Sequence, residues 1–218
     1  MMKCALPLLL LIFGTSSWAC SFDDFPIYSA MKVFPIMSNT LHNNQPLNVK
    51  GFRASVSRSA IERFYRRTWD DEVVTSRVDP WDQLSTLQDD CLMTVQLAEG
   101  DGVTEGRLVL SNLAVRPNEQ PLGQGVLLPD DAVVATDTVM TDGPKKGRVT
   151  LLASAKSPER LSRFYRSKMM RRGWLLEQNF TEGDARVLVF RDGPALTNVL
   201  IMPAPTVTQV LINSEEPR

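Results

Sequence analysis

A block of sequence occurs twice in the chain, and this repeat limits the possible folds more than any other feature. The segment Arg63–Arg66 (RFYR) recurs one hundred residues later as Arg163–Arg166, and a tryptophan, Trp69 or Trp174, follows each copy. The flanking segments also correspond, with a strand-like stretch before each block and another some distance after it. An internal repeat of this kind indicates a structural unit that is used more than once. The sequence therefore predicts a tandem duplication.

The second copy shows most clearly how one unit is built. Alternating β-branched residues over 132–141 and 148–155, separated by an Asp-Gly-Pro turn, predict a β-hairpin. Ser157 suits an N-cap, and Gly173 suits the end of a helix over about 158–172. Three or four strands are expected after this helix. We therefore expect an α+β fold of two tandem ββαβββ modules, each an antiparallel sheet with one helix packed on one face.

The repeat also sets the expected domain limits. A stretch with two prolines and two glycines separates the copies and is typical of a linker. The predicted organisation is a signal peptide over 1–19, a first α+β module over 20–115, a linker over 116–125 and a second α+β module over 126–218.

The N-terminal segment has the three-part layout of a secretory signal peptide. Lys3 is followed by a leucine-rich run and a small-residue tail that ends at Ala19. The apolar run is shorter than the roughly 20 residues that a spanning helix needs, so no membrane-spanning helix is expected after signal removal. The sequence predicts an exported protein of the periplasm or the outer-membrane periphery of a bacterium.

Two cysteines, Cys20 and Cys91, remain once the signal peptide is removed. An even number of cysteines in an oxidising compartment favours a disulfide between them. The alternative is that Cys20, as the first mature residue, carries a lipid, as in bacterial lipoproteins. Trp18 fits the lipoprotein pattern poorly, and both alternatives stay open at this point.

The second copy loosely resembles a group of bacterial exported α+β domains. In these domains a strand precedes a helix with a Ser-Pro-Glu cap, an aromatic Phe-Tyr pair and a terminal Gly-Trp. Here the match rests on Ser157–Glu159, Phe164-Tyr165 and Gly173-Trp174. The resemblance implies an architecture and a location in the cell envelope, and it implies no particular reaction.

The residues that usually carry catalysis or hold metals are scarce. His42 is the one histidine of the chain, and it lies in a polar stretch, so we expect no metal site and no cofactor. Neighbouring carboxylates, which could serve a hydrolase, occur in four places: Asp23-Asp24, Asp70–Glu72, Asp89-Asp90 and Asp130-Asp131. The sequence predicts that these positions lie in turns or at the ends of helices and strands, where aspartate is common.

The second predicted helix carries a basic face. The expected binding residues on this face are Arg160, Arg163, Arg166 and Arg171. Such a face could dock on an envelope protein, an anionic surface or an anionic glycan. Nucleic acid is not an expected partner, because 24 Lys and Arg residues are balanced by 25 Asp and Glu residues.

Three functions follow from these features. The first is a non-catalytic binding or assembly protein of the bacterial cell envelope. The second is a hydrolase or glycan-modifying enzyme that uses a carboxylate pair. The third is a carrier of a small apolar ligand held in a pocket between helix and sheet. An apolar cavity would favour the carrier, and two converging carboxylates would favour the enzyme.

Overall fold

The structure is a computed structural model, and it describes residues 20–70, 72–99, 103–113, 120–142 and 144–217. The expected signal peptide and the beginning of the expected linker lie outside the described residues. We refer to residues 20–113 as the first half and to residues 120–217 as the second half.

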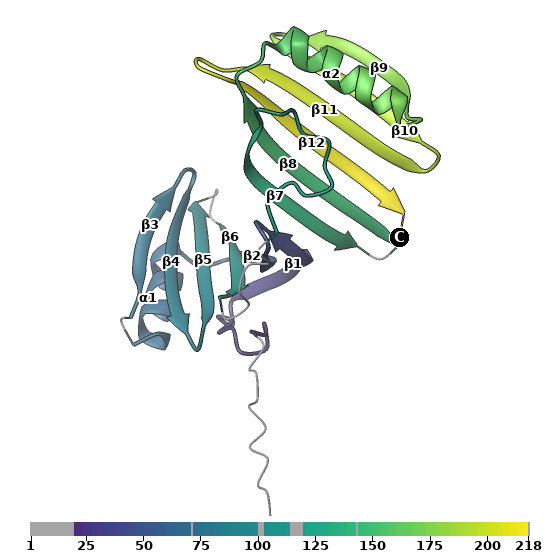
Figure 1. The fold of residues 1–218 in the computed structure, drawn as a ribbon. Helices are drawn as coiled ribbons and strands as arrows, with labels where there is room; N and C mark the ends of the chain where they lie inside the picture. Colours follow the sequence, from purple (N-terminus) through teal and green to yellow (C-terminus); the bar gives the residue numbers. More distant parts are fainter. Residues whose placement is uncertain (1–19, 71, 100–102, 114–119, 143, 218) are drawn as a thin grey trace, which may run out of the picture.

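The described residues form twelve strands and two helices (Figure 1). The elements of the first half are β1 (Met31–His42), β2 (Gln45–Ala54), α1 (Arg58–Thr68), β3 (Val74–Val78), β4 (Trp81–Gln88), β5 (Cys91–Glu99) and β6 (Thr104–Asn112). Those of the second half are β7 (Val133–Asp142), β8 (Lys145–Ser154), α2 (Pro158–Arg171), β9 (Leu175–Glu182), β10 (Ala185–Asp192), β11 (Ala195–Pro203) and β12 (Thr208–Pro217).

The expected α+β fold of two separate ββαβββ sheets is wrong. All twelve strands belong to one antiparallel sheet in the order β3-β4-β5-β6-β2-β1-β7-β8-β12-β11-β10-β9, and four strands follow each helix. The halves join because β1 pairs with β7, with Leu41 opposite Val139. Each half thereby satisfies the backbone edge that the other would expose. Hydrophobic periodicity carries no information about such edge pairing.

The strand order on one side of this junction mirrors the order on the other. Reading outward from the junction, the first half runs β1-β2-β6-β5-β4-β3, and the second runs β7-β8-β12-β11-β10-β9. Figure 1 shows the halves as two lobes, with α1 against the sheet of one and α2 against the sheet of the other. Helix α2 contacts β9, β10 and β11, and α1 contacts β5.

The limits of α2 follow the local sequence signals. The Ser157 side chain accepts a hydrogen bond from the Arg160 N–H, and a proline occupies the first turn. At the other end, Gly173 adopts a φ of +90°, and the Trp174 N–H bonds back to the Met169 carbonyl. This reversal turns the chain into β9 and brings Trp174 over the end of the helix.

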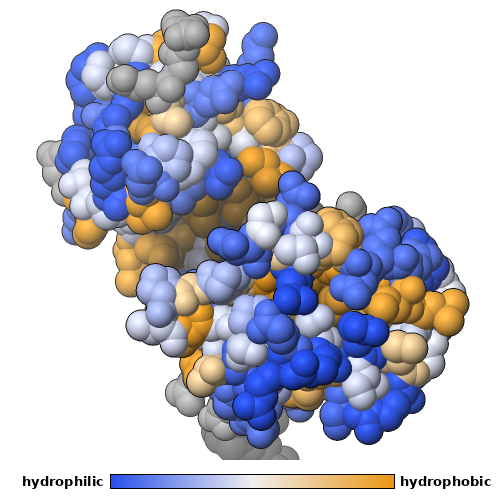
Figure 2. Space-filling model, turned by 90° about the horizontal axis from the view of Figure 1, so that it is seen from above, coloured by the Kyte–Doolittle hydropathy of each residue, from blue (hydrophilic) through white to orange (hydrophobic). Residues whose placement is uncertain are grey.

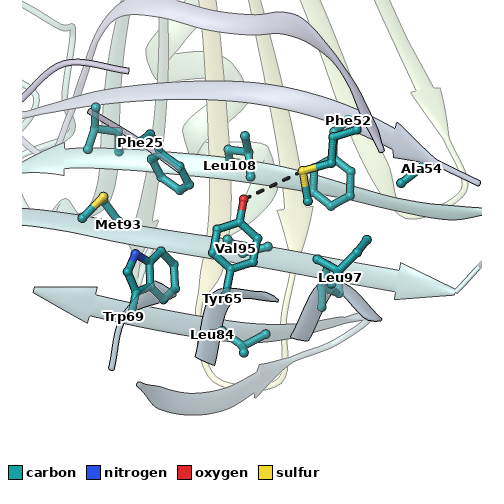
Figure 3. Close-up of a cluster of buried hydrophobic side chains, with 13 residues drawn as sticks. Phe25, Phe52, Ala54, Tyr65, Trp69, Leu84, Met93, Val95, Leu97 and Leu108 are labelled. Carbon is teal, nitrogen blue, oxygen red and sulfur yellow. Dashed lines mark hydrogen bonds between the residues drawn. The ribbon is translucent and has the colours of Figure 1, made fainter. Parts of the chain in front are cut away.

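Each helix anchors its own apolar core. The first core gathers Tyr65 and Trp69 with residues of β4, β5 and β6, and Figure 3 shows Tyr65 at its centre with Phe25 and Trp69 to one side. The second core gathers Leu161, Tyr165 and Met169 with residues of β8, β10, β11 and β12. The shared Phe-Tyr pair has the same geometry in both helices, with ring centroids 5.0 and 5.1 Å apart.

Candidate functional site

A pocket of about 160 Å³ opens beside α2 in the second half. We call it the α2 pocket. It is enclosed by the helix and its C-terminal turn, by β8, β11 and β12, and by the segment that leads into β7. Its lining residues are Gly125, Val126, Leu127, Lys146, Arg148, Tyr165, Met169, Arg172, Trp174, Thr197, Val199, Ile212, Ser214 and Glu216.

Tyr165 contributes a polar group that lacks a partner. Its side chain is 1% exposed, and among the described residues no group lies within hydrogen-bonding distance of its hydroxyl. Burial raises the pKa of this hydroxyl, so it remains a protonated donor. Leaving a buried donor unpaired costs about 1–3 kcal/mol. Trp69 Nε1 and Thr86 Oγ1 are also buried without a partner, but neither residue lines the α2 pocket.

The equivalent tyrosine of the first half is fully satisfied. The Tyr65 hydroxyl donates to the Pro26 carbonyl at 2.8 Å and lies 3.8 Å from the Met31 sulfur. The Phe25 ring packs edge-on against Tyr65 and Trp69, with centroid distances of 6.4 and 6.3 Å. Figure 3 shows these rings together in the closed core. The N-terminal segment thus fills the space beside α1.

A shared turn shows why the second half stays open. The Met31 N–H donates to the Tyr28 carbonyl, and the Ala132 N–H donates in the same way to the Pro129 carbonyl. Phe25 lies six residues before Met31, and Val126 lies six residues before Ala132, so Val126 is the residue of the second half that corresponds to Phe25. Phe25 is 3% exposed in the first core, whereas Val126 lines the α2 pocket. A smaller side chain at this position leaves space that the first half fills with a phenyl ring.

The filling segment of the first half is also held covalently. A disulfide joins Cys20 to Cys91, as the even number of cysteines predicted. Phe22 stacks on Phe25 with centroids 5.4 Å apart, and the Tyr28 ring stacks on Phe64 at 4.9 Å. These contacts fix the N-terminal segment against α1.

A buried ion pair lies beside the α2 pocket, which Arg148 lines. Asp137, 5% exposed at its side chain, accepts two hydrogen bonds from Arg148, at 2.8 and 2.6 Å. It also accepts one from the Gly123 N–H, and Arg148 in turn donates to the Gln124 carbonyl. Burial alone would raise the pKa of Asp137, but the hydrogen bonds, chiefly from Arg148, hold it below its usual value. Residues 123–125, which belong to the expected linker, are thus tied to β7 and β8.

The rim of the α2 pocket is mainly cationic. Lys146, Arg148 and Arg172 line it, together with the carboxylate of Glu216. The charge of Arg148 is matched by Asp137. Among the described residues, no carboxylate lies within ion-pair distance of Arg172. The arrangement offers apolar and polar lining residues side by side, with the buried Tyr165 donor among them.

A second hollow adjoins the α2 pocket at the junction of the halves. It measures about 370 Å³, and Lys146 and Arg148 line both cavities. Its remaining lining is largely polar, and His42 Nδ1 lies 2.8 Å from Thr138 Oγ1 across the junction. Figure 2 shows hydrophobic surface gathered in the hollow between the two lobes. None of the buried unpaired polar groups of the described residues belongs to the lining of this hollow, whereas Tyr165 lines the α2 pocket.

The residues expected to form a basic face lie elsewhere. Arg160, Arg163, Arg166 and Arg171 are all exposed on α2, and none of them lines the α2 pocket. Their docking role remains a prediction. The sequence identified Tyr165 only as part of the Phe-Tyr pair, and Arg172 was not among the expected binding residues. The sequence carried no signal for Val126, because its correspondence with Phe25 appears only when the turns before β1 and β7 are aligned.

The neighbouring carboxylates occupy turns and loops. Lys156 bonds to both Asp130 and Asp131, and it holds the pKa of Asp131 at about 2. Asp89 and Asp90 have φ values of 47° and 64° in a tight turn. In the described part of the chain, no three histidine, cysteine or carboxylate side chains are grouped as metal ligands. The hydrolase alternative stays a prediction.

Neither helix in the described residues is long and apolar enough to span a bilayer.

Comparison with known proteins found one similarity. No curated protein matches the chain, and no solved structure does. A family described as START domain-like matches residues 133–215. This segment runs from the start of β7 into β12 and includes α2. The half of the chain that contains the α2 pocket is therefore the half that is similar to START domain-like proteins.

Proposed function

We propose that this chain is a non-catalytic carrier that binds a small apolar ligand in the α2 pocket. The observation that carries the proposal is the pocket itself, which is lined by both apolar and polar residues, among them Tyr165, whose buried hydroxyl has no partner in the described residues. The similarity of residues 133–215 to a START domain-like family supports it, because such a fold suggests ligand binding.

The size of the pocket limits the ligand. An engineered apolar cavity of about 150 Å³ binds benzene, and the α2 pocket measures about 160 Å³. The buried part of the ligand is therefore one ring or a short branched chain. Burying apolar surface contributes about 25 cal/mol per Å². Most of the affinity would come from the apolar surface of the ligand itself, because Val199, Ile212 and Met169 are already buried in the ligand-free protein.

The compartment forms part of the proposal. The disulfide between Cys20 and Cys91 is consistent with an oxidising compartment such as the bacterial periplasm. We propose that the protein binds its ligand there, after removal of residues 1–19. The mass of the protein isolated from cells checks this, since it gives the first mature residue and any lipid on Cys20.

The binding experiment uses isopropylbenzene as the probe. The disulfide-bonded protein is titrated with the probe, and backbone amide NMR shifts are followed. We expect saturable binding, with the largest shifts in α2, β11 and the segment around Val126. Val126→Phe should abolish it, because a phenyl ring would then occupy the pocket. If the wild-type protein shows no saturable binding of isopropylbenzene, cyclohexane or 1-hexanol, the proposed function is wrong.

A further inference from the structure

In the first half, the Phe25-Pro26 segment fills the space beside α1, and it does so with two chemical groups. The Phe25 ring supplies an aromatic surface against Tyr65 and Trp69. The Pro26 carbonyl supplies an acceptor for the Tyr65 hydroxyl, at 2.8 Å. Ring and carbonyl are neighbours in the chain, and Figure 3 shows the ring beside Tyr65 and Trp69.

The second half lacks both parts. Val126 stands where the ring would be, and the Tyr165 hydroxyl has no partner among the described residues. Part of the receiving side is shared by the halves, because Tyr165 lines the α2 pocket as Tyr65 lines the first core. Four residues after the tyrosine, α2 has Met169 where α1 ends at Trp69, and Trp174 lines the pocket from the turn after α2. The missing parts therefore describe the molecule that would complete the second core.

We infer that the ligand of the α2 pocket is a single-ring aromatic compound that also carries a carbonyl oxygen, and that Tyr165 selects it by donating a hydrogen bond to that oxygen. This inference rests on the proposed function and specifies its ligand class. The pocket volume of about 160 Å³ admits one ring, since about 150 Å³ suffices for benzene. An acceptor in the ligand would remove the cost of the unpaired Tyr165 hydroxyl.

The test compares two probes of the same shape that differ in one group. Acetophenone carries a carbonyl where isopropylbenzene carries a methyl group. Both are titrated against the wild-type protein and Tyr165→Phe, and affinities are measured by NMR. We expect Tyr165→Phe to lower the ratio of acetophenone affinity to isopropylbenzene affinity about three- to tenfold, which is the contribution of one hydrogen bond. The ratio cancels the different aqueous solubilities of the probes.

Tyr65→Phe is the matched control, since it removes the same hydroxyl from the half whose space is filled. It should leave the affinity ratio unchanged. If Tyr165→Phe also leaves the ratio unchanged while both probes bind the wild-type protein, the ligand class is wrong and pocket binding stands. If neither probe binds the wild-type protein, the ligand class is wrong, and the proposed function is wrong as well when cyclohexane and 1-hexanol also fail to bind.

Discussion

Tyr65 and Tyr165 occupy the same place on the two helices. Of these two hydroxyls, that of Tyr65 has a hydrogen-bond partner and that of Tyr165 has none among the described residues. Both side chains are almost fully buried, with 0% and 1% exposed. The difference arises from the segment that precedes the first strand of each half. In the first half that segment reaches the tyrosine, and in the second it leaves the α2 pocket open.

The two tyrosines should therefore respond differently to loss of the hydroxyl. Tyr65→Phe removes a satisfied bond and should lower the free energy of unfolding by about 1 kcal/mol. Tyr165→Phe removes an unpaired buried donor and should leave that free energy unchanged or raise it. Urea denaturation of the ligand-free variants measures both. A larger loss in Tyr165→Phe than in Tyr65→Phe would show that the Tyr165 hydroxyl is paired in solution.

Exchanging the residue types at positions 25 and 126 should close the cavity in the second core and open one in the first. Val126→Phe should fill the α2 pocket and raise stability by about 1 kcal/mol, as cavity filling commonly does. Phe25→Val should open a cavity beside Tyr65 and lower stability by about 2–4 kcal/mol. Thermal unfolding of both variants gives the comparison. Destabilisation by Val126→Phe would mean that the pocket cannot accept a ring of this size.

The disulfide should contribute strongly to the stability of the first half. Cys20 and Cys91 are 71 residues apart, and in the chain-entropy model closing a loop of that length stabilises the folded state by about 4 kcal/mol. The variant with both cysteines changed to serine should unfold at correspondingly lower urea concentration. Addition of a reductant should shift the wild-type protein in the same direction and leave the variant unchanged. If the reductant shifts the unfolding of both proteins equally, the Cys20–Cys91 disulfide is not the cause of the shift.

Asp137 should stabilise the fold in a pH-dependent way. Its pKa is held below the usual value in the folded protein, and the unfolded value is about 3.9. The contribution is therefore complete above about pH 5 and is lost as the pH falls through the folded pKa. Asp137→Asn should cost about 3 kcal/mol at pH 7, and the difference from wild type should shrink in acid.

Urea denaturation of the wild-type protein and Asp137→Asn between pH 7 and pH 2.5 tests this. Asp23→Asn serves as a control, because Asp23 is exposed and outside the Arg148 network. A stability difference between wild type and Asp137→Asn that stays constant down to pH 2.5 would contradict the assignment.

Local sequence signals determined the helices, the hairpins and the cysteine pair. Ser157, Pro158 and Gly173 set the limits of α2 because caps and turn residues act over a few neighbouring positions. The repeated Phe-Tyr pair likewise identified the residues that anchor both cores. The pairing of Cys20 with Cys91 followed from there being two cysteines in the predicted mature chain.

How these elements combine depends on contacts between parts of the chain that are far apart in sequence. The pairing of β1 with β7 made one twelve-stranded sheet, because strand edges bond through backbone groups that every sequence carries. The α2 pocket depends on Val126 standing in the place of Phe25, and that correspondence appears only once the turns before β1 and β7 are aligned in space. The two tyrosines could be identified from the sequence. Whether each tyrosine hydroxyl has a hydrogen-bond partner depends on residues distant in sequence that fold against it.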